Sequence, residues 1–168
     1  MQQSYDVEAL ISQMADDLKA RLQALPPDKI AMIGIHTGGV WIAERLHALL
    51  GLSLPLGTLD ISFYRDDFSR IGMNPQVKPS TLPVAVDDNH IVLVDDILHT
   101  GRTIRAAMNE LFDYGRPASI MLVVLGERSG RELPIQPDVE GTHIDLQANE
   151  HVKLSGPEKL ALNVTRLP

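Results

Sequence analysis

Two adjacent carboxylates, Asp95 and Asp96, follow the apolar run Ile91–Val94, and a short loop with hydroxyl groups and a glycine comes next. A continuous apolar run is typical of a buried parallel strand, and open α/β sheets bind ligands at the carboxyl ends of such strands. Helical spacing begins directly after this loop, so backbone amides and a helix N-terminus are expected beside the acids. These groups suit a ligand that carries sugar hydroxyls next to a phosphate.

Two other interpretations exist for an acid that follows a strand. A single Asp is often only the N-cap of the next helix, but two adjacent carboxylates are costly to desolvate unless a cation or hydrogen-bond donors accompany them. An acid pair that holds magnesium in a nucleotide triphosphatase needs a G-x-x-x-x-G-K-[ST] loop. The sequence has neither that loop nor G-x-G-x-x-G, so the sugar-phosphate interpretation is preferred.

The composition favours one globular domain with a substantial core. The chain has 168 residues, of which 44% are hydrophobic and 22% charged. It contains no cysteine, no apolar run of membrane-spanning length and no signal-peptide pattern, so we expect a cytoplasmic protein without membrane contact. The net charge of −7 opposes a surface that binds nucleic acid throughout, although a local basic patch remains compatible with it.

Hydrophobic periodicity predicts alternating strands and helices along most of the chain. Such alternation is typical of right-handed crossovers and a mostly parallel twisted sheet flanked by helices, which is an α/β fold. The predicted helices span 6–24, 40–50 and 103–114, and the predicted strands span 30–35, 54–63, 91–94, 118–125 and 160–166.

Two regions of the single domain, 1–168, break this alternation. Residues 64–83 have no clear period and contain Arg65, Arg70 and Lys78, which favours a flexible lid loop that closes over an anion, with an idle loop as the alternative. Residues 126–157 are rich in turn formers, and we expect them to form a small cap away from the main sheet.

The chain resembles the type I phosphoribosyltransferases, whose signature is an apolar strand, two acids and a T-G-x-T loop. Residues 91–103 carry each of these features. The segments IGIHTGG, LDISFYRDD, LVDDILHTGRTIRAAM, YGRPASI and RELPI are further similar, in this order, to the PyrR family of pyrimidine operon regulators and uracil phosphoribosyltransferases. The resemblance covers residues 33–166 and implies the type I phosphoribosyltransferase fold, with a small cap, or hood, and a flexible lid.

The resemblance also implies a reaction, in which uracil and 5-phosphoribosyl 1-pyrophosphate (PRPP) give uridine monophosphate (UMP) and pyrophosphate. Asp95 and Asp96 would hold the ribose hydroxyls and stabilise positive charge on the ribose, and Arg65 would neutralise pyrophosphate. Mg²⁺ would be held near the two acids through substrate and water, without direct protein ligands. The residues that this resemblance assigns to PRPP and its phosphates are Thr37, Gly38, Gly39, Ile97, Leu98, His99, Thr100, Gly101, Arg102 and Thr103.

Several positions near the expected site depart from the family or have two interpretations. Gly38 stands where close relatives often carry an arginine, which removes a charge-assisted contact to pyrophosphate. Arg128 and the backbone of Val152 match positions that contact uracil, and the segment RELPI could be only their scaffold. His99 could hydrogen-bond the base or accept its proton, or contribute only its backbone amide to phosphate binding.

Three functions remain open from the sequence. The intact acid pair and T-G-x-T loop favour a working enzyme, with regulation of pyrimidine genes as a further role. The alternative is a regulator that binds the leader RNA of a pyrimidine operon with weak or no catalysis. A nucleotide-sensing or assembly protein that has lost both activities is the third. Scattered cations and Gly130, where relatives carry a histidine, argue against RNA binding as the main role. The resemblance suggests a homodimer or larger homo-oligomer.

Overall fold

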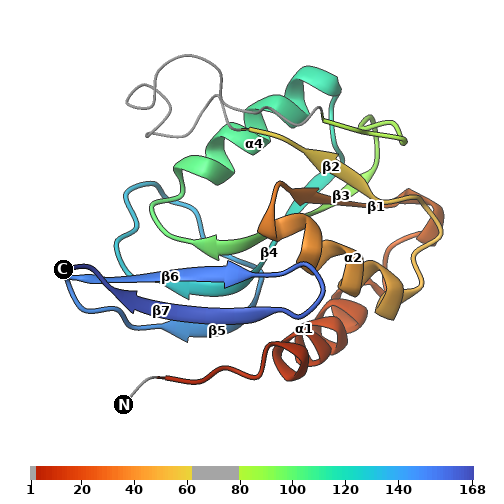
Figure 1. The fold of residues 1–168 in the computed structure, drawn as a ribbon. Helices are drawn as coiled ribbons and strands as arrows, with labels where there is room; N and C mark the ends of the chain where they lie inside the picture. The colour runs from red at the N-terminus through yellow and green to blue at the C-terminus, as the bar shows by residue number, and fades with distance from the viewer. Residues whose placement is uncertain (1–2, 62–79) are drawn as a thin grey trace.

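A computed structural model describes residues 3–61 and 80–168, and its described part is an α/β domain (Figure 1). A five-stranded sheet has the order β2-β1-β3-β4-β5, and each neighbouring pair is parallel. Its strands are β1 (Ile30–Ile35), β2 (Gly57–Leu59), β3 (His90–Leu98), β4 (Ser119–Arg128) and β5 (Val139–Ile144). The predicted parallel sheet flanked by helices is confirmed.

Helices cover both faces of this sheet. On one face α1 (Val7–Leu22) and α2 (Gly38–Leu50) share a core with Val92 and Val123, and on the other face α4 (Arg102–Tyr114) packs on Leu93 and Val124 (Figure 1). Strand residues therefore alternate between the two cores, and all six residues of β1 are buried. A 3-10 turn, η1 (Pro27–Lys29), connects α1 to β1.

The ends of the first two helices follow from local chemistry. Oδ1 of Asp6 accepts a hydrogen bond from the amide of Ala9 at 3.1 Å, so Asp6 is the N-cap of α1. Gly51 ends α2 with a left-handed φ of 59°. No helix in the described ranges is long and apolar enough to cross a membrane.

Strand β3 extends further than the sequence predicts. The prediction ended this strand at Val94, but in the structure Asp95 pairs with Val124 and Ile97 with Gly126. The reason is that β4 also runs on, to Arg128, and supplies backbone partners for the polar residues. Asp95 and Asp96 therefore lie near the end of a paired strand and not in a loop. The strand pairing fixes their backbone.

The predicted cap at 126–157 requires a correction. Strand β5 pairs in parallel with β4 and so belongs to the main sheet. A separate antiparallel pair is formed by β6 (Glu150–Ser155) and β7 (Ala161–Arg166). Leu154 and Leu162 of this hairpin pack into the core with α1 and α2. The many turn-forming residues in this range favoured a prediction without strands. The strands β5 and β6 are short and become stable only beside their partners.

The predicted lid and the strand at 54–63 are described only in part. Residues 62–79, which include Arg65, Arg70 and Lys78, lie outside the described residues. The described part of the strand, β2, is only three residues long. Thr81 forms an antiparallel bridge with Thr58, and the amide of Asp60 donates to Oγ of Ser80 at 3.0 Å. The two ends of the undescribed segment are thus joined at the edge of the sheet.

Candidate functional site

A cavity of about 210 Å³ lies where β3 ends and α4 begins. Gly101 is the N-cap of α4 and has a φ of +94°, a conformation that glycine adopts without the strain of a side chain. The predicted phosphate-loop residues 97–103 all line this cavity. The complete lining is Asp95, Ile97, Leu98, His99, Thr100, Gly101, Arg102, Thr103 and Ile104.

The two acids are held by their own backbone. Oδ1 of Asp95 accepts from the amide of Asp96 at 2.8 Å, and Oδ1 of Asp96 accepts from the amide of Ile97 at 2.7 Å. Asp95 is only 4% exposed, whereas Asp96 is half-buried. Asp95 therefore lines the cavity, whereas Asp96 lies next to it in the strand, outside the cavity lining, and is the more exposed of the two carboxylates.

A second glycine-containing loop, 36–39, lies on the other side of the acids, where β1 ends and α2 begins, and its two glycines are the first residues of α2. Strand β1 pairs with β3, so the loop 36–39 is adjacent to the ends of both strands. A Cβ on Gly39 would lie 2.6 Å from the carbonyl oxygen of Val94, and a Cβ on Gly38 would collide with the carboxylate of Asp96. In this structure the carboxylate of Asp96 thus occupies the space that a side chain at position 38 would need.

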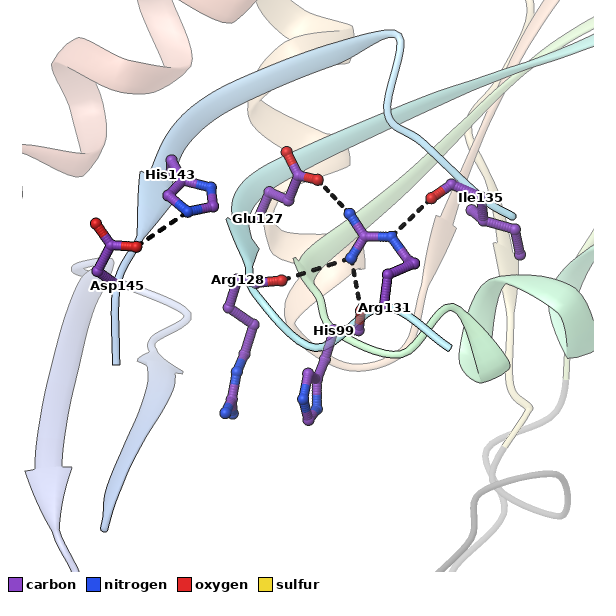
Figure 2. A network of polar contacts seen from close by, with 7 residues as sticks. All are labelled: His99, Glu127, Arg128, Arg131, Ile135, His143 and Asp145. Carbon is purple, nitrogen blue, oxygen red and sulfur yellow. Dashed lines mark hydrogen bonds and ion pairs between the residues drawn. The ribbon is translucent and has the colours of Figure 1, made fainter. Parts of the chain in front are cut away.

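Residues 99–101, the centre of the predicted phosphate loop and called the phosphate loop below, are braced by Arg131–Ile135, which we call the brace segment (Figure 2). Nη1 of Arg131 donates to the carbonyl of His99 at 2.6 Å, and its Nη2 forms an ion pair with Glu127. The amides of Glu132 and Leu133 both donate to the carbonyl of Thr100, at 3.0 and 3.1 Å. The segment RELPI, for which the sequence allowed a role as scaffold alone, therefore contacts the phosphate loop directly.

His99 and Arg128 form the side of the site where a base is expected. Figure 2 shows their side chains next to each other, both pointing away from Arg131. Partial burial, and then the charge of Arg128, lower the pKa of His99 from its ordinary value of 6.5, which favours a neutral imidazole. Nε of Arg128 is buried and has no hydrogen-bond partner within the described ranges. The pair can therefore offer a donor and an imidazole to a ligand.

Gly130 provides room for this imidazole. A Cβ on Gly130 would lie 2.8 Å from Nε2 of His99, and the φ of Gly130 is +111°. The glycine that replaces the relatives' histidine therefore stands against a histidine contributed by the phosphate loop.

The charge of His151, which lies in β6, is the last of the causes that lower the pKa of His99. Val152 follows His151 and pairs with Val164 of β7. The contact of the Val152 backbone with a base stays a prediction.

The polar network continues from the brace segment into β5. Glu140 of β5 shares a hydrogen bond with Glu127, and this hydrogen bond, followed by burial, raises the pKa of Glu140 above its ordinary value of 4.5. Nε2 of His143, in β5, lies 3.1 Å from Oδ1 of Asp145, which follows the strand (Figure 2). Because β5 pairs with β4 in the main sheet, Glu140 and His143 lie beside the pair Glu127–Arg131.

Sequence reasoning missed the contacts of Arg131, although a signal was present. Glu127 and Arg131 are opposite charges four residues apart at the end of a strand. Nothing in that spacing shows that the arginine reaches the loop 99–101, more than 30 residues earlier in the chain. Of the predicted site residues, Arg65 lies outside the described residues, so its role stays a prediction.

Known proteins resemble the chain over most of its length. A family model described as phosphoribosyl transferase domain matches residues 4–157. A protein of Nitrosococcus oceani named "Bifunctional protein PyrR" is 59% identical over 163 residues, which cover 96% of this chain and 92% of that protein. A protein of Pseudomonas aeruginosa with the same name is 58% identical over 153 residues, with 91% and 90% covered.

A solved structure, a hypoxanthine phosphoribosyltransferase of Trypanosoma cruzi, aligns with a TM-score of 0.70 and 19% identity. The alignment covers 95% of this chain and 91% of that chain, and at this identity it shows a shared fold alone.

Proposed function

The chain belongs to the PyrR branch of the phosphoribosyltransferase family, and from this premise we propose that it makes UMP and pyrophosphate from uracil and PRPP. One observation supports the proposal above others. The fixed acid pair, Asp95 and Asp96, lies between two glycine-containing loops, and each loop leads into the N-terminus of a helix. PRPP has the matching pattern, because its ribose diol lies between a 5′-phosphate and a pyrophosphate.

The donor would bind across both loops. The amides and hydroxyls of residues 99–103 would hold the 5′-phosphate at the start of α4, where the helix dipole favours an anion. Thr37 and the amides after it would hold pyrophosphate at the start of α2. Asp95 and Asp96 would accept hydrogen bonds from the two ribose hydroxyls, and their negative charge would stabilise the ribosyl cation that develops as the C1′–O bond to pyrophosphate breaks.

The acceptor would bind beside His99 and Arg128. The N1 atom of uracil forms the new bond to C1′, the electron pair of the broken bond stays on pyrophosphate, and the N1 proton leaves. A neutral imidazole at 99 suits this step, because it can accept a hydrogen bond from the base or take up its proton. Arg128 would donate a hydrogen bond to a uracil carbonyl, because a carbonyl oxygen accepts hydrogen bonds and a guanidinium only donates them.

Mg²⁺ fits this site as a substrate-held ion. Within the described ranges no group of three or more histidine, aspartate or glutamate residues is arranged to hold a metal ion. Two carboxylates at the end of β3 match the preference of Mg²⁺ for few protein ligands together with water and phosphate oxygens. When bound, Mg²⁺ would neutralise charge on the pyrophosphate oxygens. Arg65 would add a cation there, a role that belongs to the lid hypothesis.

Turnover of labelled uracil tests the proposal. The purified chain with PRPP, Mg²⁺ and uracil should form UMP, and Asp96→Asn should slow this by about a hundredfold, because the developing charge loses one carboxylate. Hypoxanthine and orotate serve as competing acceptors. Absence of UMP with the wild-type chain, or equal use of hypoxanthine, would refute the assigned reaction.

The name of the 58–59% identical relatives, "Bifunctional protein PyrR", supports a second role. We propose that the UMP-bound form also regulates pyrimidine genes through leader RNA. A gel-shift titration with a pyrimidine leader transcript, with and without UMP and at several salt concentrations, tests it, because phosphate contacts make affinity fall with salt. A UMP-independent, unspecific shift would contradict it. Sedimentation of the same samples would report the expected homo-oligomer.

A further inference from the structure

The brace segment holds the phosphate loop by its carbonyl groups. We propose that Arg131 is a positioning residue, which fixes the peptide planes of the phosphate loop so that the amides of Thr100 and Gly101 face the 5′-phosphate of the donor. The inference rests on the proposed function for the identity of that phosphate. It assigns to Arg131 a task that neither the acids nor the base site performs.

The guanidinium of Arg131 donates hydrogen bonds to other groups of the protein. Its Nε donates to the carbonyl of Ile135 at 2.7 Å, its Nη1 to the carbonyls of His99 at 2.6 Å and Arg128 at 3.5 Å, and its Nη2 to Glu127. The side chains of Arg131 and Glu127 are 21% and 22% exposed, so the pair is largely shielded. A guanidinium with these partners is positioned to hold the backbone around it.

The carbonyl of the next loop residue is fixed by the same segment. The amides of Glu132 and Leu133 converge on the carbonyl of Thr100, at 3.0 and 3.1 Å. Arg131 also donates to the carbonyl of Arg128, at the end of β4, and to that of Ile135, at the end of the brace segment. Arg131 thereby positions the amides of Glu132 and Leu133. The carbonyls of His99 and Thr100, two successive residues of the loop, both point toward the brace segment.

The direction of the carbonyls determines the direction of the amides. In a trans peptide the N–H points opposite to the C=O, and the cis peptides among the described residues lie elsewhere, at His36–Thr37 and Gly156–Pro157. The N–H groups of Thr100 and Gly101 therefore point away from the brace segment. Both residues line the cavity at the start of α4, and within the described ranges neither amide donates to a protein acceptor.

Only arginine can make this set of contacts. The planar guanidinium reaches three carbonyls and a carboxylate in fixed directions, whereas a lysine ammonium would keep the charge but lose the fork. The two substitutions Arg131→Lys and Arg131→Gln therefore separate geometry from charge. If geometry is the function of Arg131, lysine will not rescue the loop.

Steady-state kinetics of the two variants test the proposal. We expect both R131K and R131Q to raise the KM for PRPP by about tenfold to a hundredfold, the effect of one or two weakened hydrogen bonds to a charged group. The KM for uracil should change less than threefold. The matched control is Arg166, an exposed arginine that pairs with Glu150 on the β6–β7 hairpin, and R166K and R166Q should leave both constants unchanged.

A binding measurement separates positioning from folding. In ¹H–¹⁵N spectra of the wild-type chain, ribose 5-phosphate should shift the amide signals of Thr100 and Gly101 strongly. In R131K these shifts should be smaller and the Kd at least tenfold higher, while the spectrum elsewhere stays native. If R131Q does not fold, R131K and Glu127→Gln, which leaves the guanidinium in place but weakens its anchor, carry the test.

The outcomes are distinct. Wild-type affinity for ribose 5-phosphate in R131K, or a KM for PRPP within twofold of wild type in a folded R131Q, would overturn the positioning role. A lower melting temperature with unchanged KM would show that the segment is only scaffold. If the wild-type chain binds ribose 5-phosphate but makes no UMP, the proposed reaction fails while the role of Arg131 in the loop still stands or falls by the spectra.

Discussion

The two glycine loops of the site are built in different ways. The loop 36–39, which includes the first two residues of α2, is fixed by close packing, because Gly38 and Gly39 lie directly against the acids of the neighbouring strand. The loop 99–101, between β3 and α4, is fixed by hydrogen bonds from the brace segment, 30 residues further along the chain. Both loops precede a helix at the same edge of the sheet.

The difference shows how each loop should fail. A loop that is fixed by packing has no room for a methyl group, and the added atom displaces either the backbone of β3 or the carboxylate of Asp96. A loop that is fixed by hydrogen bonds tolerates small volume changes but depends on a distant arginine. The predictions below test this contrast, from the largest effect to the smallest.

Gly39→Ala should have the largest effect. The new Cβ would meet the carbonyl oxygen of Val94 at 2.6 Å and the Cα of Asp95 at 2.9 Å, and both belong to a central strand that cannot retreat. We expect the free energy of unfolding in urea to fall by about 2–3 kcal/mol, with loss of turnover. Gly51→Ala is the control, since nothing lies within 4 Å of a Cβ there and only the φ of +59° costs about 1 kcal/mol. Equal losses at both glycines would contradict the packing argument.

Gly38→Ala should impair catalysis more than stability. Its Cβ collides with the carboxylate of Asp96, which is a side chain and can swing away at the expense of its position. Turnover of uracil should fall by about tenfold to a hundredfold, because small displacements of a catalytic group have effects of this size. The melting temperature should stay closer to wild type than that of Gly39→Ala. An active Gly38→Ala would show that the placement of Asp96 is not critical.

His99→Gln should change the pH dependence of stability. The pKa of His99 is lowered in the folded state, so the folded chain binds fewer protons than the unfolded chain just below pH 6.5. Stability from this group is therefore complete above that pH and is lost as the pH falls. Urea unfolding of wild type and His99→Gln between pH 5 and pH 8 should show a shallower decline on the acid side for the variant. A parallel pair of curves would contradict the lowered pKa.

Glu140→Gln should have the smallest effect and the opposite sign. The pKa of Glu140 is raised by its hydrogen bond with Glu127, so the folded chain binds more protons than the unfolded chain above pH 4.5. Stability from this group is lost as the pH rises through the raised pKa. Glutamine keeps a donor for Glu127 at all pH values, so the variant should lose less stability between pH 5 and pH 8. A steeper loss would refute the shared proton.

Local sequence patterns were sufficient to predict the part of the site where β3 ends and α4 begins. The run of apolar residues before Asp95, the glycine in T-G-x-T and the helical spacing after it each depend on neighbours in the chain, so the strand, the loop and the start of α4 follow from the sequence. The extension of β3 to Leu98 did not follow, since it depends on β4 as a partner. Strand β5 was missed for the same reason.

The sequence by itself determined which chemical groups the candidate site contains, because the acid pair, the two glycine loops and the predicted parallel sheet are local features of side-chain type and spacing. The tertiary structure decided which groups support that chemistry. It brought Arg131 to the carbonyl of His99, Gly38 against Asp96 and Gly130 against His99, contacts between segments far apart in the chain. Such contacts depend on how strands pair and pack, and no local pattern of residues encodes their distances.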